Sequence, residues 1–293
     1  MRVFVTGATG WVGSAVVGEL IAAGHQVTGL SRSDDKAVAL AATGAEVVRG
    51  TLDDLDTLRS AASAADAVIH TAFSHDFSKF VENCEQDRRA IEILGSALEG
   101  SDRPFLVTGG VALLTPGRVA TEADVPPSDP SFPRKSEAAA RALAERGVRA
   151  ATVRLSPSVH GLGDHGFIPI LIGLAREKGV SAYIGEGLNR WPGVHRLDAA
   201  RLYRLGLEHG ASEPAYHGVA DAGVPFKAIA EVIGRQLGLP VESRGREHFG
   251  WFADFAGADM PASSARTQSL LGWKPTGPDL LTDIDQPGYY PQS

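Results

Sequence analysis

Cysteine, basic clusters and long apolar runs are all scarce in this 293-residue sequence, and each scarcity excludes a class of protein. The single cysteine, Cys84, has no partner for a disulfide bond within the chain. The most apolar later run, residues 167 to 175, is nine residues long, whereas a helix needs roughly 20 to cross a bilayer. The formal net charge is −7, and no basic block offers an electrostatic reason to bind nucleic acid. The first residues, MRVFVTG, lack the basic segment and apolar stretch of a secretory signal. We therefore expect a cytoplasmic protein with neither a nucleic acid nor a membrane as partner.

What the sequence does contain is a repeated alternation of short apolar runs with segments of helical character. In the first expected helix Val12, Val16 and Leu20 fall on one stripe, and Gly24 supplies a left-handed residue that ends the helix. Strand-then-helix repeats build a parallel sheet covered on both faces, so the pattern predicts an α/β fold with a doubly wound parallel sheet. The expected strands cover residues 2 to 6, 26 to 30, 45 to 49, 66 to 73, 103 to 109 and 149 to 155.

The most informative motif is TGATGWVG, in which Gly7, Gly10 and Gly13 stand three residues apart between the first strand and the first helix. Glycines at this spacing permit a tight turn, close approach of the backbone to a pyrophosphate, and close contact between helix and strand. The alternative is a turn of small residues without a ligand. Because a strand precedes the motif and a helix follows it, we predict a Rossmann-type dinucleotide-binding site.

The alternation breaks after residue 155, in the loop SPSVHGLGDHGF, which is rich in Gly, Pro and Ser. Residues 1 to 155 are therefore expected to form the dinucleotide-binding domain, and residues 156 to 293 mainly a smaller substrate-binding lobe. A helix and a strand near residues 195 to 220 are expected to pack back onto the sheet, with Asp198 as the N-cap of that helix.

The end of the second expected strand indicates which dinucleotide binds. A carboxylate there usually holds a 2′-hydroxyl, whereas a 2′-phosphate prefers a cation. The residues present are Ser31, Arg32 and Ser33, so Arg32 can pair with the phosphate while the serines donate hydrogen bonds. This favours NADPH over NADH. The alternative is that Arg32 is a solvated surface arginine and that Asp34 or Asp35 takes the ribose.

The segment GTLDDLDTL after the third expected strand offers Asp53 or Asp54 as an acceptor for an adenine amino group. Both are also suitable caps for the following helix.

Taken together, TGATGWVG, LSRS, GTLDDLDTL, HTAF, LVTGG, RLSPSVHG, VHRLDAARLY and LGWKPTG resemble, in that order, the extended and atypical branch of the short-chain dehydrogenase/reductase family, which includes epimerases and dehydratases. The similarity covers almost the whole chain. It implies contacts to the pyrophosphate from Gly7, Thr9, Gly10, Trp11 and Val12, and to the adenine from Leu52 and Asp53. It further places His70, Thr71, Ala72 and Phe73 under the cofactor, and Leu155, Pro157 and Val159 near the nicotinamide.

The sequence departs from this family at the catalytic pair. The family carries a Ser or Thr after the fifth strand, which Thr108 matches only loosely, and a Tyr-x-x-x-Lys pair in which the tyrosine gives a proton to the carbonyl oxygen. The natural register puts Pro133 and Glu137 at those two positions, and neither can replace the family residue. A shift of two residues puts Ser131 and Lys135 there instead, which restores the amine that binds the ribose but not the acid.

Arg134 and Lys135 stand at the start of an expected helix, where the helix dipole disfavours cations. They therefore indicate a nearby anion: a cofactor phosphate, a substrate carboxylate or Glu137. The candidate proton donors are His75 and Asp76 after the fourth expected strand, Lys135, and His160 or His165, and histidine is the easiest replacement because it titrates near neutrality. His160 stands where the family has a turn aromatic, which favours packing over catalysis. No three-ligand metal cluster and no G-x-S-x-G elbow are present.

Apolar residues on the segments that should converge on the cofactor, among them Phe73, Phe80, Phe167 and Trp191, predict a small, largely apolar substrate. The alternative is that several of them belong to the core. We expect an NADPH-dependent oxidoreductase that transfers hydride to a carbonyl or imine. A non-catalytic NADP-binding redox sensor and a sugar-nucleotide epimerase or dehydratase are the alternatives. By analogy with the family, a homodimer is also expected.

Overall fold

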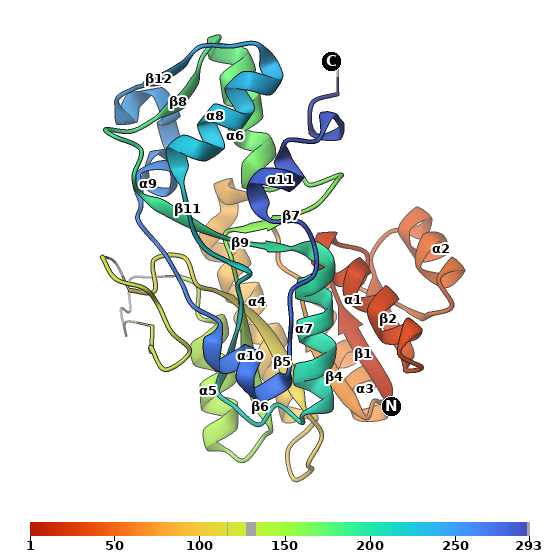
Figure 1. The fold of residues 1–293 in the computed structure, drawn as a ribbon. Coiled ribbons are helices and arrows are strands. Elements are labelled where there is room, and N and C mark those ends of the chain that lie inside the picture. The colour runs from red at the N-terminus through yellow and green to blue at the C-terminus, as the bar shows by residue number, and fades with distance from the viewer. Residues whose placement is uncertain (116, 127–132, 292–293) are drawn as a thin grey trace.

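The computed structural model describes residues 1–115, 117–126 and 133–291, and its centre is one seven-stranded sheet (Figure 1). The strand order is β10-β6-β5-β4-β1-β2-β3, and every neighbouring pair is parallel. The predicted α/β class with a doubly wound parallel sheet is therefore confirmed. The strands are β1 (Arg2–Thr6), β2 (Gln26–Ser31), β3 (Glu46–Arg49), β4 (Ala67–His70), β5 (Phe105–Gly110), β6 (Ala150–Leu155) and β10 (Ala215–Gly218).

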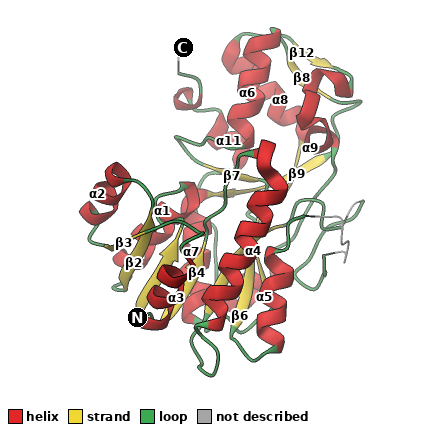
Figure 2. Ribbon diagram, turned by 180° about the vertical axis from the view of Figure 1, so that it is seen from behind, coloured by secondary structure: helices red, strands yellow, loops and turns green. Residues whose placement is uncertain are grey.

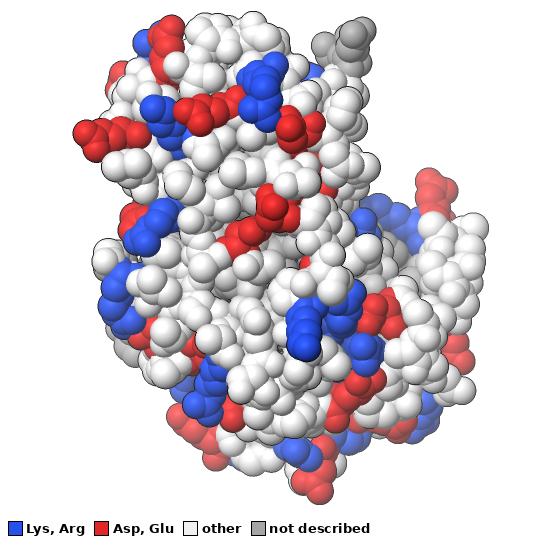
Figure 3. All heavy atoms as spheres, in the orientation of Figure 1, with Lys and Arg blue, Asp and Glu red and all other residues white. Residues whose placement is uncertain are grey.

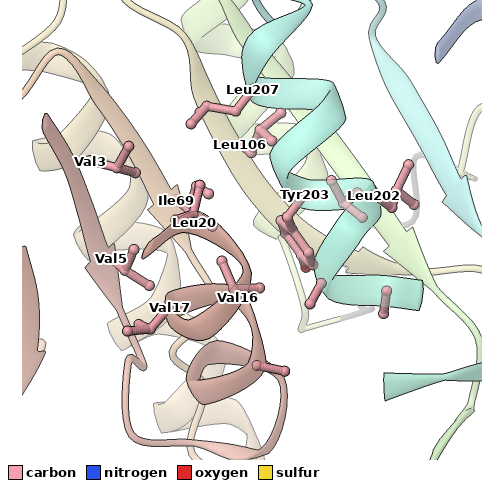
Figure 4. Close-up of a cluster of buried hydrophobic side chains, with 14 of the residues drawn as sticks. Val3, Val5, Val16, Val17, Leu20, Ile69, Leu106, Leu202, Tyr203 and Leu207 are labelled. Atoms are coloured by element: carbon pink, nitrogen blue, oxygen red, sulfur yellow. The ribbon is translucent and has the colours of Figure 1, made fainter. Parts of the chain in front are cut away.

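Helices cover both faces of this sheet. One face carries α1 (Trp11–Ala22), α2 (Asp34–Ala42) and α7 (Arg196–Glu208). The other face, seen from behind in Figure 2, carries α3 (Leu55–Ala64), α4 (Phe80–Ser96) and α5 (Ser136–Glu145). Apolar residues of β1, β4 and β5 point toward α1 and α7 (Figure 4). Burying one such side chain stabilises the fold by roughly 1.5–3 kcal/mol, so the apolar residues of these strands together hold the sheet between its two helix layers.

The first helix follows the sequence prediction closely. Val16 and Leu20 are fully buried against the sheet, while Val12 is partly buried at its edge. Gly24 follows the helix with φ = +84°, the left-handed conformation that the sequence predicts for its end.

Helix α7 and strand β10 return to the sheet from beyond residue 155. The helix begins at Arg196 and has His195 as its N-cap, so the prediction of Asp198 as N-cap is wrong. Asp198 lies in the first turn and is buried. Its carboxylate accepts hydrogen bonds from the backbone N–H groups of Thr276 and Gly277, because the loop after α10 (Ala265–Leu271) packs against this end of the helix.

The remaining elements form a lobe above the carboxyl ends of the sheet strands (Figure 1). Its core contains Phe167 and Trp191, and Trp191 is fully buried between Phe226 and Phe252. These two predicted pocket residues are therefore core residues. The elements of the lobe are β7 (Ser158–His160), α6 (Phe167–Lys178), β8 (Ser181–Tyr183), β9 (Arg190–His195), β11 (Asp221–Pro225), α8 (Phe226–Leu237), β12 (Val241–Ser243), α9 (Ala253–Gly257) and α11 (Leu280–Ile284), with short 3₁₀ turns η2 (Arg246–Phe252) and η3 (Pro287–Tyr289). A third 3₁₀ turn, η1 (Phe77–Lys79), precedes α4.

The surface carries mixed charge. On the face drawn in Figure 3, acidic and basic side chains are interspersed, and no large patch of one sign stands out. Within the described ranges, no helix is both long enough and apolar enough to cross a membrane.

Candidate active site and cofactor site

The glycine motif forms a tight cradle between β1 and α1. Gly7 has φ = +67°, and a Cβ atom there would lie 2.6 Å from the backbone N of Ala72. A Cβ on Gly13 would lie 2.0 Å from the carbonyl oxygen of Gly7. Gly10 is the N-cap of α1 and, having no side chain, leaves the first N–H groups of the helix without a side-chain cap. This geometry fits a pyrophosphate, which the helix N-terminus would bind through these N–H groups.

The segment after β4 runs directly beside this cradle. The Thr71 hydroxyl donates to the carbonyl oxygen of Thr6, and both Thr71 and Ala72 lie against Gly7. His70 differs from the expectation, because its side chain is 1% exposed and faces inward. Its ring bonds Thr6 Oγ1 at 2.7 Å and Asp87 Oδ1 at 3.0 Å. His70 therefore supports the loop from below, and its ring has no access to a cofactor.

The end of β2 presents a cation where a 2′-phosphate would lie. Arg32 is exposed and forms no hydrogen bond or ion pair with any described part of the chain. Ser33 is the N-cap of α2 and makes no side-chain cap, whereas the Ser31 hydroxyl is buried and donates to the Ser33 carbonyl. Asp34 pairs with Arg49 at 2.6 Å. Arg32 and Ser33 are thus available to a ligand, while Ser31 is not.

The adenine side of the predicted site is divided between two aspartates. Asp54 occupies the N-cap position of α3, but its carboxylate accepts from the backbone N–H of Thr51, which precedes the helix, and makes no side-chain cap to α3. Asp53 instead accepts from Gln86 at 2.6 Å and lies 3.6 Å from Arg89, both on α4. Leu52 is half-buried against the α3 and α4 layer. Asp53 remains solvent-exposed and could accept a further hydrogen bond.

On the nicotinamide side, the chain leaves β6 at Leu155 and enters the lobe through Pro157 and β7. Leu155 belongs to the core and its carbonyl accepts from Val111. The carbonyl oxygen of Val159 accepts from Trp11 Nε1 at 2.7 Å, so the first turn of α1 is tied to the lobe. The guanidinium of Arg196 lies 4.2 Å above the Trp11 ring and donates to Ser14, which strengthens the same junction.

The start of α5 holds the residues that the sequence comparison aligns with the family's catalytic pair. Glu137 forms a forked pair with the buried Arg154, at 2.8 Å and 2.5 Å, rather than holding a ribose. Lys135 is the half-buried N-cap residue of α5. Ser131 lies outside the described residues. Arg134 packs on Phe73, with its guanidinium carbon 4.4 Å from the ring centre.

The structure commits the hydroxyl of Thr108 to the core. Thr108 Oγ1 bonds the carbonyl oxygen of His70 at 2.7 Å and the hydroxyl of Tyr203 at 2.6 Å. Tyr203 lies on α7 and is fully buried, and its burial raises the pKa of the phenol well above the ordinary value of 10.0. This tyrosine therefore stabilises the packing of α7 on β5 and does not replace the missing acid, and Thr108 has no free hydroxyl for a substrate.

His160 has a structural position too, as the packing alternative predicts. Its side chain is fully buried, and Nδ1 bonds Asp283 Oδ2 at 2.8 Å. Asp283 also accepts from the hydroxyl of Tyr289, which in turn accepts from the Gly161 N–H. This network fastens the C-terminal segment to β7. His160 therefore cannot act as a proton donor to a substrate.

Titratable side chains also lie near the junction of sheet and lobe. His75 contacts Phe73 edge-on at 5.4 Å, and loss of water around the ring, followed by the charges of Arg134 and His165, lowers the pKa of His75 below 6.5. Burial raises the pKa of Asp164 to about 6. His165 contacts the Trp11 ring at 5.6 Å, so this loop lies against the glycine cradle. In the described ranges no three His, Cys, Asp or Glu side chains form a metal-binding group.

Sequence reasoning missed Asp87 and Ser136, which lie under the site. Asp87 follows Cys84 and precedes Ile91 on the buried stripe of α4, and a carboxylate on an apolar stripe is the signal that could have revealed it. It accepts from the Ser136 hydroxyl at 2.5 Å and from His70.

The fold and the cradle define a dinucleotide-binding α/β protein, and comparison with known proteins identifies its family. Residues 7–155 match a family model described as NAD(P)H-binding. The chain is 48% identical to an uncharacterized protein of Schizosaccharomyces pombe, over 99% of this chain and 100% of that protein. It is 26% identical to a 4-hydroxy-2-methyl-3-oxo-4-farnesyl-3,4-dihydroquinoline-1-oxide ketoreductase of Stigmatella aurantiaca, over 83% of this chain and 75% of that protein.

Solved structures agree on the fold. A dTDP-glucose 4,6-dehydratase of Streptomyces venezuelae with NAD bound has a TM-score of 0.78 at 19% identity, covering 99% of this chain and 97% of that one. A UDP-glucose 4-epimerase of Thermus thermophilus in complex with NAD has a TM-score of 0.76 at 18% identity, covering 98% of each chain. The chain belongs to the NAD(P)H-binding family, within the extended and atypical short-chain dehydrogenase/reductases.

Proposed function

We propose that the protein is an NADPH-dependent oxidoreductase that reduces a carbonyl or imine group of a small, largely apolar substrate. The observation that carries this proposal is the cradle of Gly7, Gly10 and Gly13 beside the uncommitted Arg32 and Ser33. Both features suit a dinucleotide with a 2′-phosphate. The ketoreductase name of the Stigmatella aurantiaca relative supports a carbonyl substrate. The substrate's apolar part would contact Phe73 and Phe80, whose ring centres are 6.2 Å apart.

The chain would bind the cofactor along β1, β2 and β4, and the bound dinucleotide would supply the hydride. The first turn of α1 would hold the pyrophosphate, and Arg32 the 2′-phosphate. Of the candidate catalytic residues, Thr108 and His160 are committed to the core. We assign proton donation to His75, whose ring lies against Phe73, and positioning of the ribose to Lys135 at the start of α5. Because the pKa of His75 lies below 6.5, reduction should slow as the pH rises through that pKa.

A non-catalytic NADP-binding sensor is the second candidate. It is favoured by Glu137, which pairs with the buried Arg154 at the position where the family carries its lysine. A sensor needs the cradle but no acid.

Consumption of NADPH by the purified protein separates these two functions. The assay follows a panel of ketones, aldehydes and cyclic imines, with NADH as the control cofactor. Turnover of a panel member supports the oxidoreductase. A fall in that turnover of at least tenfold in each of His75→Asn and Lys135→Ala supports proton donation by His75 and ribose positioning by Lys135. A tenfold fall corresponds to a loss of about 1.4 kcal/mol in transition-state stabilisation. Tight NADPH binding without consumption of any panel member would instead establish the sensor.

A further inference from the structure

A basic and aromatic group of side chains lies beside the cradle. We define the Arg134 cluster as Phe73 and His75 after β4, Arg134 before α5, and His165 before α6. Arg134 covers the face of Phe73 at 4.4 Å, and His75 meets the edge of the same ring at 5.4 Å. Arg134 and His165 both act electrostatically on His75. Because Phe73 follows the residues that contact Gly7, the cluster is adjacent to the predicted cofactor site.

A buried hydrogen-bond chain fixes the Arg134 side chain. Its Nε donates to Ser136 Oγ at 3.2 Å, and that hydroxyl donates to Asp87 Oδ2 at 2.5 Å. Asp87 Oδ1 bonds His70 Nε2 at 3.0 Å, and His70 Nδ1 bonds Thr6 Oγ1 at 2.7 Å. The four supporting residues are at most 2% exposed. The guanidinium is therefore held rigidly on one side by this chain and on one face by the phenylalanine ring.

The opposite side of the guanidinium makes one long hydrogen bond with the described residues. Nη2 donates to the Thr108 carbonyl oxygen at 3.5 Å, and Nη1 makes no hydrogen bond to a described residue. Glu137, the carboxylate nearest in sequence, is occupied by Arg154 and Arg141. Both oxygens of Asp87 are occupied by His70 and Ser136. No carboxylate of the described chain contacts Arg134, although the side chain is half-buried.

A fixed, half-buried arginine with no carboxylate in contact suits an incoming anion, because a guanidinium binds a carboxylate through two parallel hydrogen bonds. We propose that Arg134 binds a carboxylate of the substrate, so that the molecule reduced is an oxo acid. Ser136, Asp87 and His70 position Arg134 for this contact, and Phe73 flanks the apolar part of the ligand. This inference rests on the proposed oxidoreductase function and names its substrate class.

Binding without turnover tests the inference. Glyoxylate, pyruvate and phenylglyoxylate are each titrated against the neutral amide of the same acid, by calorimetry on the protein saturated with NADP⁺. At least one acid should bind about tenfold or more tightly than its amide, as a charge-assisted hydrogen bond predicts. Arg134→Gln should abolish that preference. Arg141→Gln is the matched control, because Arg141 lies on α5, just after Arg134 in the chain, and pairs with Glu137.

Five results are distinguished. Loss of the preference in Arg134→Gln, with NADP⁺ affinity unchanged and the Arg141→Gln preference retained, supports the inference. Equal or undetectable binding of acid and amide in all three pairs overturns it, as does an unchanged preference in Arg134→Gln. Acid binding through Arg134 in a protein that never consumes NADPH would refute the oxidoreductase while leaving the anion site standing. Reduction of neutral ketones alone would support the oxidoreductase and overturn the carboxylate site at Arg134.

Discussion

Arg32→Ala should selectively weaken the binding of NADPH. The side chain is exposed at the end of β2 and forms no ion pair within the described chain, so its removal costs little in folding. A charged hydrogen bond contributes roughly 1.5–3 kcal/mol, and solvent screening at an exposed site favours the lower end. A loss of about 1.5 kcal/mol corresponds to a roughly tenfold increase in the Kd of NADPH. NADH has no 2′-phosphate, so its Kd should change less than about twofold.

The assay is a fluorescence titration of both cofactors at two salt concentrations. The loss for NADPH should shrink at high salt, because the interaction is between exposed charges. Arg235→Ala is the control, since Arg235 is also an exposed arginine but pairs with Asp285 in the lobe. Equal losses for NADPH and NADH in Arg32→Ala would refute the reasoning and return Arg32 to the solvated surface.

Three further predictions concern the cradle, the lobe junction and pH. Gly13→Ala should cost about 1–3 kcal/mol of stability through overpacking, measured by urea unfolding, and should weaken NADPH binding in the fluorescence titration. Gly18→Ala is the control, because its Cβ would meet nothing within 4 Å, and it should be neutral or stabilising in both measurements. Asp283→Asn should lower the free energy of unfolding by about 3 kcal/mol, because it breaks the buried pair with His160; an unchanged urea midpoint would contradict this. Folding raises the pKa of Asp164 from 3.8 to about 6, so its stabilising contribution is complete below pH 3.8 and is lost as the pH rises to about 6. Asp164→Asn should remove that dependence, at most about 3 kcal/mol, from unfolding curves measured between pH 3.5 and 8.

The sequence predicted the sheet and the cofactor cradle well, because both depend on local patterns. The apolar runs marked the first six strands to within a few residues, although the fourth ends at His70 instead of continuing to Phe73. The spacing of Gly7, Gly10 and Gly13 predicted the turn correctly, since only glycine fits where the backbone of β1 and the start of α1 nearly touch.

The side-chain assignments were less successful where a residue has more than one suitable partner. His160 and Thr108 carry groups suited to catalysis, but Asp283 and Tyr203, distant in sequence, hold them in the core. The sequence left a ligand anion and Glu137 open as partners of Arg134, and the structure shows Glu137 paired with Arg154 instead.

The sequence by itself thus determined the α/β class, the strand-then-helix repeat and the dinucleotide cradle, because periodicity and glycine spacing act over a few residues. Only the tertiary structure decided which polar side chains are free to meet a ligand. The hydrogen bonds that settle this join β4 to α4, α4 to α5, and β7 to α11, across separations of 17 to 123 residues. Buried polar groups must find partners wherever the fold places them, and no local pattern specifies those partners.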